Sequence, residues 1–528
     1  MILTTPRSRR STTTLSRDML HALPVSQDTN VAPGPLVLTK DGRIKGITVD
    51  KAHIFYGIPY ADPPVGAYRW KPPRPVSPWS GVYNASFPRP ACMQLLLLKS
   101  STRRIPMTSV SEDCLYLNIF VPLDVNFSSP LRSPLPVMVW IHGGDFIAGS
   151  ASKPLYDGRF ISNFTRTVLV SMEYRLGAFG FLVSGKDLHT SAAGNYGILD
   201  QQEALLWVQR NIAVFGGDPS KVTIFGESAG AQSVSLHLMI QSSKPLFKQA
   251  VLQSLPFSIP LKTSGHAWIN VAPSRSSVCD EDPAVSRTLS SLSTSDGPDG
   301  NCKQLFSAEI GLMKKKKRRI SARLRKDFVY ICVDAAIQHE GRRLSLSPYI
   351  NVQNYHHRSA HFTDSSFKTD VLFIFCPQIV TDYVFLCPSR RSARAGTAVG
   401  SKLWMYVFDH TASDHRVWSG LTFCYQHACH GAELPFLFDS AAVANFTLMP
   451  SEKLLSNRML CYWGAFAHTG DPSSRVQQTT FCREQRLPVW PRYSDTSGWL
   501  VMNLTVRSHA QVGTRNHMCD FWDQLGIY

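Results

Sequence analysis

The stretch from Phe215 to Gly230, FGGDPSKVTIFGESAG, constrains the fold of this chain more than any other segment. A short apolar run, Val222–Phe225, leads into Gly-Glu-Ser-Ala-Gly, and apolar residues at helical spacing follow it. The spacing therefore predicts a strand, a sharp turn with Ser228 at its apex, and a helix. Glycines stand two places either side of the serine because so tight a turn leaves no room there for side chains.

This turn also predicts a chemical role for Ser228. The strained backbone holds the serine hydroxyl in the open, and the amide of Ala229 points toward an oxyanion that would form on a substrate. The N-terminus of the following helix adds partial positive charge beneath it. A bare Gly-x-Ser-x-Gly motif also occurs by chance in loops, but the flanking strand and helix are the context that a nucleophile needs.

Apolar segments on both sides of this turn alternate between strand and helix patterns. Pro136–Ile141 is apolar throughout, as in a fully buried strand, and Thr167–Glu173 and Lys248–Ser254 are further strand candidates. Between them, Asn195–Ile212 has the spacing of an amphipathic helix. This alternation predicts an α/β fold whose central sheet is doubly wound and mostly parallel.

The chain resembles the type-B carboxylesterase/cholinesterase family of the α/β-hydrolase superfamily over about residues 36–260 and 380–528. The resemblance implies an α/β-hydrolase fold with a small N-terminal antiparallel sheet in addition to the central sheet. It implies one domain over residues 35–528, after a basic segment, residues 1–34, that we expect to be disordered. The segments that carry it are Gly57–Trp79, Ser111–Pro122, His142–Phe146, Phe215–Gly230, Cys424–Phe438 and Trp463–Pro472.

The loop His142-Gly143-Gly144-Asp145-Phe146 follows the apolar strand and resembles the oxyanion-hole loop of the family. The resemblance implies that the amides of Gly144, Asp145 and Ala229 bind the oxyanion. The family usually has a third glycine where this chain has Asp145. An ionised carboxylate there would oppose the developing negative charge unless its side chain turns away.

His430, in the segment CYQHACHGAELPFLF, resembles the catalytic histidine of the family. It comes after the nucleophile, in the order serine, acid, histidine. His410 and His427 are nearby alternatives. The acid that would orient the imidazole is harder to find. Glu340, which precedes Gly341 and follows an apolar run, is the nearest match, and a plain surface glutamate is an equal interpretation.

The twelve cysteines include no zinc-like Cys-x-x-Cys pair, and the chain has five Asn-x-Ser/Thr sequons. Disulfides and an oxidising compartment, either secreted or in the ER lumen, are therefore the favoured interpretation, although residues 1–34 show no signal peptide. Cys424 and Cys429 are close enough for a local bridge. The resemblance implies three other pairs: Cys92–Cys114, Cys279–Cys302 and Cys387–Cys519.

Residues 303–375 match the family poorly and contain the run KKKKRR and a His-rich segment. They could be a surface insertion, a basic interaction loop, or translated non-coding sequence in a faulty gene model, and we favour the last. Much of the net charge of +17 lies in Lys314–Arg343 and in the first twenty residues. A charge run is usually a solvated face, so we expect no nucleic-acid partner. No run of about 18 apolar residues predicts a transmembrane helix.

These observations predict a serine carboxylic ester hydrolase that acts on small-molecule esters through an acyl-enzyme, without a metal or cofactor. Residues 93–113 contain no aromatic side chain, whereas cholinesterases of the family carry a tryptophan in this loop that binds the quaternary ammonium. We therefore expect uncharged esters to be preferred over choline esters. The alternative is a non-catalytic, neuroligin-like adhesion protein on the same fold. The physiological ester and the oligomeric state are left open.

Overall fold

The structure is a computed structural model. Several predictions fall on residues outside its described part, namely those on Glu340, on the Cys279–Cys302 bridge, on the N-terminal segment and on most of 303–375. The described residues are 34–94, 110–128, 133–183, 194–257, 329–332, 380–418, 420–476, 479–513 and 515–525.

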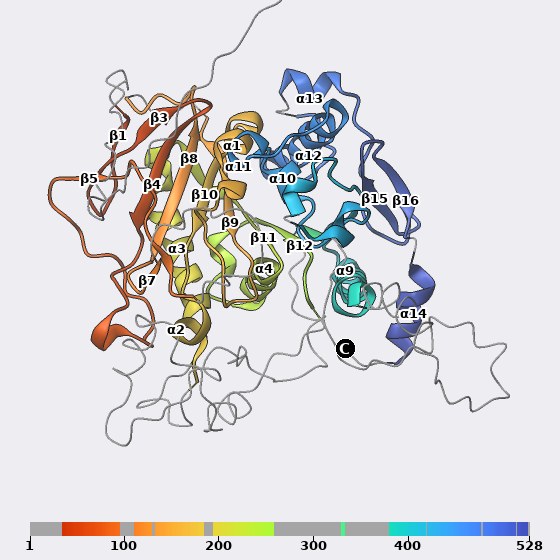
Figure 1. Cartoon of the computed structure of the whole chain (residues 1–528), viewed down its shortest axis with the longest axis horizontal. Coiled ribbons are helices and arrows are strands. Elements are labelled where there is room, and N and C mark those ends of the chain that lie inside the picture. The colour runs from red at the N-terminus through yellow and green to blue at the C-terminus, as the bar shows by residue number, and fades with distance from the viewer. Residues whose placement is uncertain are drawn as a thin grey trace, which may run out of the picture.

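A large sheet runs through the molecule, from the red and orange strands on the left of Figure 1 to the dark blue strands on the right. Its described strands follow the order β16-β15-β14-β13-β12-β11-β9-β10-β8-β4-β3. Pairing is parallel from β10 through β9, β11, β12, β13 and β14 to β15, and antiparallel at both ends of the sheet. The strands are β3 Ile47–Val49, β4 Ala52–Pro59, β8 Tyr116–Pro122, β9 Leu135–Ile141, β10 Val168–Met172, β11 Gly217–Glu227, β12 Gln249–Gln253, β13 Val329–Cys332, β14 Lys402–Phe408, β15 Leu500–Leu504 and β16 His509–Val512.

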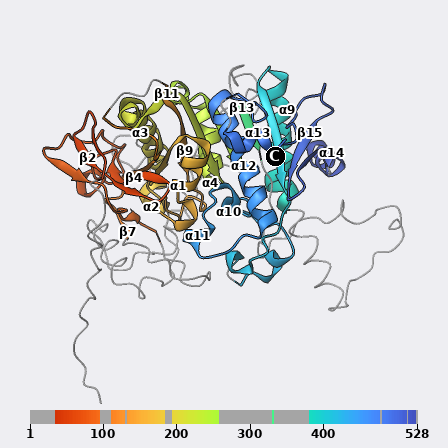
Figure 2. The same cartoon turned by 90° about the horizontal axis from the view of Figure 1, so that it is seen from above.

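Strand β9 shows why the sheet is doubly wound. Val137, Val139 and Ile141 belong to one hydrophobic core, whereas Met138 and Trp140 belong to a second core on the opposite face. Side chains alternate between the faces of a strand, so a strand covered on both sides must be apolar at every position. Figure 2 shows helices on both sides of the strands.

The helices divide between the two cores. Buried residues of α3 and α4 belong to the first core, and those of α1 and α12 belong to the second. The described helices are α1 Arg159–Thr165, α2 Gly177–Phe181, α3 Tyr196–Asn211, α4 Ala229–Met239, α9 Cys387–Ala398, α10 Leu434–Leu437, α11 Ala441–Ala444, α12 Pro450–Thr469, α13 Thr480–Glu484 and α14 Asn516–Leu525.

The small N-terminal sheet differs from the prediction. Its described strands are β1 Leu36–Leu38, β2 Arg43–Lys45 and β5 Val82–Asn84. β1 and β2 pair antiparallel, but β2 and β5 pair parallel, so the sheet is mixed rather than antiparallel. The long segment between β2 and β5 provides the crossover that a parallel pair requires. A short parallel pair, β6 Ala91–Cys92 and β7 Val110–Ser111, lies beside the Cys92–Cys114 bridge.

Four disulfides join described cysteines. The structure links Cys92 to Cys114 and Cys387 to Cys519, the pairings that the resemblance implied, and it closes the local Cys424–Cys429 bridge. The fourth, Cys461–Cys482, joins α12 to α13 and was not predicted. Four bridges in one chain favour an oxidising compartment.

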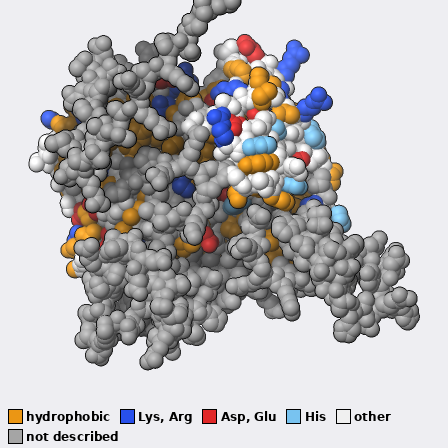
Figure 3. All heavy atoms as spheres, in the orientation of Figure 1, with side chains coloured by type: hydrophobic (Ala, Val, Ile, Leu, Met, Phe, Trp, Pro, Cys, Tyr) orange, Lys and Arg blue, Asp and Glu red, His pale blue; other side chains and the backbone are white. Residues whose placement is uncertain are grey.

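The surface of the described residues is chemically mixed. On the face drawn in Figure 3, Lys and Arg side chains of the C-terminal half are interspersed with acidic, histidine and hydrophobic side chains. Among the helices of the described ranges, none has the length and apolar character needed to cross a membrane.

Candidate active site

Ser228 lies at the junction that the sequence predicted. β11 ends at Glu227 and α4 begins at Ala229, so the serine is the single residue between them. Its φ of 58° and ψ of −123° are a strained conformation for a residue with a side chain. The Ser228 amide donates to the Gln253 carbonyl at 2.9 Å, and its carbonyl accepts from the Gln232 amide at 2.9 Å. The backbone is therefore held at both ends while the side chain stays half-buried.

The two glycines of the motif are required by close packing against β9. A Cβ atom on Gly226 would lie 2.6 Å from the Ile141 carbonyl oxygen, and one on Gly230 only 2.0 Å from the same oxygen. Both distances are far below van der Waals contact. The tight approach of the turn to the end of β9 therefore explains the spacing Gly-x-Ser-x-Gly in this chain.

The loop after β9 packs directly against this turn. A Cβ atom on Gly143 would lie 3.1 Å from the Ser228 Cβ and 2.6 Å from the Glu227 carbonyl oxygen. Gly144, Asp145 and Phe146 all have positive φ, at 120°, 55° and 59°. Asp145 thus occupies a conformation that suits glycine better, as expected where the family has a third glycine. The role of the three predicted amide donors stays a prediction.

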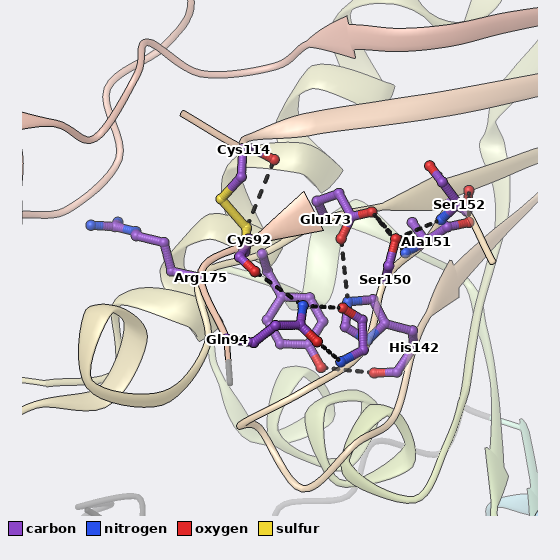
Figure 4. Close-up of polar contacts among 12 residues, drawn as sticks. Cys92, Gln94, Cys114, His142, Ser150, Ala151, Ser152, Glu173 and Arg175 are labelled. Carbon is purple, nitrogen blue, oxygen red and sulfur yellow. Dashed lines mark hydrogen bonds and ion pairs between the residues drawn. A yellow bond between two sulfur atoms is a disulfide. The ribbon is translucent and has the colours of Figure 1, made fainter. Parts of the chain in front are cut away.

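A largely buried network of polar contacts holds this loop (Figure 4). Glu173 Oε1 accepts hydrogen bonds from Ser150 Oγ at 2.6 Å and from the Ala151 amide at 2.9 Å. The His142 ring stacks on Tyr174 with centroids 4.5 Å apart, and the Tyr174 hydroxyl donates to the His142 carbonyl at 2.7 Å. Gln94 bonds in both directions with the Gly149 backbone. The loop is thus held by hydrogen bonds before any substrate arrives.

Burial sets the charge state of this network. Burial lowers the pKa of His142 to about 3, so its imidazole is neutral at physiological pH. Burial likewise raises the pKa of Glu173 to about 7, although its hydrogen bonds from Ser150 and Ala151 act in the opposite direction. His142 therefore supports the loop as a neutral ring and adds no charge beside the serine.

His430 lies against the serine turn. Its Nε2 is 2.8 Å from Oε1 of Glu227, the residue immediately before Ser228, and its side chain is 25% exposed. Its ring also contacts the ring of Phe385, with centroids 5.2 Å apart. Gly431, with φ of 79°, turns the chain into α10 directly after the histidine. The structure thus brings His430 next to Glu227, the residue that precedes Ser228, although the two lie about two hundred positions apart in the sequence.

The two alternative histidines serve other contacts. His410 Nε2 is 3.0 Å from Glu452 Oε1, and that glutamate belongs to the first turn of α12. His427 is exposed and stacks on Phe423 with centroids 4.3 Å apart. Of these three histidines, His430 is the one that contacts Glu227, at the serine turn.

Comparison with known proteins identifies the family of this chain. The model of the Carboxylesterase family matches residues 33–274 and 308–522. The chain belongs to the carboxylesterase family. It is 32% identical to an acetylcholinesterase from Bungarus fasciatus over 561 aligned positions, covering 93% of this chain and 86% of the relative. It is 31% identical to a cholinesterase from Mus musculus over 542 positions, covering 92% and 86%.

Membership of the carboxylesterase family implies the α/β-hydrolase fold and supports carboxylic ester hydrolysis as the general activity. The parallel strands β9 to β15, with helices on both faces, agree with that fold. The family match from residue 308 onward also includes most of 303–375. Within that segment the structure describes β13, which pairs with both β12 and β14.

Sequence reasoning missed a pair of carboxylates beside His430. Glu433 is fully buried and accepts a hydrogen bond from Gln253 Nε2 at 3.0 Å. Burial, and secondarily the charge of Glu227, raise the pKa of Glu433 to about 7. Glu433 therefore holds a proton more readily than an ordinary glutamate, and Glu227 is the carboxylate whose oxygen contacts the imidazole. The sequence could have indicated Glu227, because it is an acidic residue directly before the serine of the motif.

Proposed function

We propose that the protein is a serine carboxylic ester hydrolase that acts through an acyl-enzyme intermediate. The observation that carries this proposal is the 2.8 Å contact between His430 Nε2 and the glutamate that precedes Ser228. This contact supports the proposal, because it holds the His430 imidazole beside the residue that precedes Ser228. The intact turn and the family membership favour hydrolysis over the neuroligin-like adhesion protein.

In the proposed acylation step, Ser228 Oγ attacks the ester carbonyl carbon and its proton passes to His430. The carbonyl oxygen becomes an oxyanion that would accept hydrogen bonds from the amides of Gly144, Asp145 and Ala229. Collapse of the tetrahedral intermediate breaks the bond to the alcohol oxygen, which takes the proton from His430. Water then attacks the acyl-serine with His430 again as base, releasing the acid and free Ser228.

Two carboxylates have roles in this proposal. Glu227 stabilises the charged imidazolium by its negative charge, since its Oε1 lies 2.8 Å from Nε2. Glu340 stays the predicted orienting acid, outside the described residues. Its position in the sequence supports this role, because it comes eight residues after the end of β13, a strand parallel to its neighbours in the sheet that also contains β11. Parallel strands end on the same edge of a sheet, where ligand sites form.

Labelling with a fluorophosphonate tests the proposed nucleophile directly. This probe phosphonylates a serine only when the hydroxyl is activated. We expect one covalent adduct, located by mass spectrometry on the peptide that contains Ser228, and loss of ester hydrolysis in proportion to labelling. An unlabelled protein, or an adduct on another serine with Ser228 unmodified, contradicts the proposal and favours the adhesion alternative.

We further propose a preference for uncharged esters. The support is the lack of an aromatic residue between Cys92 and Cys114, since a cation–π contact with such a ring contributes about 0.5–2 kcal/mol to binding a quaternary ammonium. Acetylcholine and its uncharged isostere 3,3-dimethylbutyl acetate differ in charge but not in shape. We expect kcat/KM for the uncharged ester to equal or exceed that for acetylcholine. A tenfold advantage for acetylcholine would show that another group binds the cation.

Secretion as a glycoprotein is the proposed cellular setting. The four disulfides support it, and so do the sequons at Asn126 and Asn445, whose side chains are exposed. Asn445 ends α11 in the left-handed conformation, at the surface. Asn503, in contrast, is 7% exposed within β15, so we propose that this sequon is not glycosylated in folded protein.

Reduction of the Cys387–Cys519 bridge is expected to inactivate the protein before the central sheet melts. This bridge spans 132 residues and joins α9 to α14. A loop of that length contributes about 4–5 kcal/mol in the chain-entropy model, out of a typical stability of about 5–15 kcal/mol. Phe385, two residues before Cys387, contacts His430, so loosening of α9 should displace the imidazole.

Activity, circular dichroism and alkylation of each cysteine are measured together during stepwise reduction. We expect ester hydrolysis to fall with alkylation of Cys387 and Cys519 while the strand signal persists. The double substitution Cys387→Ala/Cys519→Ala should reproduce this loss without reductant. Alkylation of both cysteines in native, unreduced protein would refute the pairing and remove one support for secretion.

A further inference from the structure

His430 follows directly after a disulfide whose loop is very short. Cys424 and Cys429 are five positions apart, and Cys429 is the residue before His430. The other described bridges have separations of 21, 22 and 132, and neither cysteine in any of them is adjacent to a predicted catalytic residue. A crosslink in this place acts on the backbone from which the imidazole extends.

The two cysteines are the buried anchors of an otherwise exposed segment. Within residues 421–429 they are 3% and 6% exposed and belong to the second core, whereas every other side chain is exposed or half-buried. The segment consists of a 3₁₀ turn, Thr422–Tyr425, followed by irregular backbone. Its aromatic stacks, Tyr425 on His415 and Phe423 on His427, involve partly or fully exposed side chains.

The chain after His430 is held by different means. The Cys429 carbonyl accepts a hydrogen bond from the Ala432 amide at 2.9 Å, and Glu433 and the residues of α10 are buried. His430 is therefore fixed on one side by a buried helix and on the other by the crosslinked Cys429. Its ring must keep a 2.8 Å contact with Glu227 and still reach Ser228.

We propose that the Cys424–Cys429 disulfide is a positioning device for His430, which it holds in register with the serine turn. This inference rests on the proposed function, in which His430 is the base. A displacement of about 1 Å in a reacting group can lower a rate by about 10²-fold. Opening the bridge would return rotational freedom to the backbone immediately before His430, while the sheet and the Ser228 turn keep their own contacts.

Two double substitutions test the proposal. Cys424→Ala/Cys429→Ala removes the bridge beside His430, and Cys461→Ala/Cys482→Ala removes a bridge of equally buried cysteines between α12 and α13. For the first variant we expect kcat on p-nitrophenyl acetate to fall about 10- to 100-fold with KM changed less than about threefold. For the second variant we expect kcat within about twofold of the unaltered protein, even if its Tm falls by as many degrees as that of the first variant. Equal losses of kcat in the two variants would overturn the proposal.

A chemical measurement decides the same question without ester turnover. Diethyl pyrocarbonate modifies accessible neutral imidazoles, and mass spectrometry locates the modified peptide. Relative to the exposed His509, we expect His430 to be modified several times faster when Cys424 and Cys429 are replaced, and at an unchanged rate in the Cys461 and Cys482 variant. If the unaltered protein hydrolyses no ester, the proposed function fails, while this rate still tests the positioning. An unchanged His430 rate overturns it.

If the first variant does not fold, graded reduction of the unaltered protein replaces it. A phosphine reductant opens the bridges in steps, and alkylation reports the opened fraction of each one. The proposal expects His430 reactivity to rise with the opened fraction of Cys424–Cys429. A rise that follows only Cys461–Cys482 or global unfolding contradicts it.

Discussion

Replacing Ser228 with alanine is expected to lower kcat for p-nitrophenyl acetate by about 10⁶-fold, the loss found when a triad serine is removed. The large factor follows from the proposed mechanism, because no acyl-enzyme can form without the hydroxyl. Residual hydrolysis should come only from binding and oxyanion stabilisation. Turnover by Ser228→Ala within about tenfold of the unaltered protein would falsify the assignment.

The fold should survive this substitution. Alanine meets the same backbone strain at φ of 58° as serine does, and both backbone hydrogen bonds of residue 228 remain available. We therefore expect a change in Tm of no more than a few degrees. Ser235→Ala is the matched control, since Ser235 is a buried serine on α4 whose hydroxyl bonds only the Gln232 carbonyl among described groups. That variant should keep full activity.

Replacing His430 with glutamine is expected to lower kcat by about 10⁴- to 10⁶-fold. In a catalytic triad, removing the histidine alone costs about as much activity as removing all three residues. Glutamine keeps a polar side chain of similar reach but cannot accept the serine proton.

His427→Gln is the control for this experiment. The two histidines lie in one segment, but His427 is exposed and stacks on Phe423 rather than reaching the serine turn. We expect its kcat to stay within about twofold of the unaltered protein. A large loss in both variants would point to a structural role of the segment, and a loss in His427→Gln alone would move the assignment to that residue.

Local features of the site were predictable because their causes lie within a few residues. The glycines of Gly-x-Ser-x-Gly are required by contacts at the turn itself, and β9 is apolar at every position because both its faces are buried. The same reasoning indicated helix α3 and strands β10 and β12 to within one or two residues. In each case the spacing of apolar residues or glycines in the sequence follows from the local backbone conformation and burial.

The sequence by itself determined the sharp turn at Ser228, the loop after β9 and the doubly wound sheet, because these depend on backbone geometry and on burial of nearby residues. Only the tertiary structure decided which side chain meets His430. Glu227 and Gln253 are neighbours because β11 and β12 pair in parallel, and His430 and Glu433 reach them from a segment nearly two hundred residues later. The parallel pairing of β2 with β5 and the Cys461–Cys482 bridge were decided in the same way. Contacts of this kind depend on how elements distant in the sequence pack together, and the residue spacing within one segment does not predict that packing.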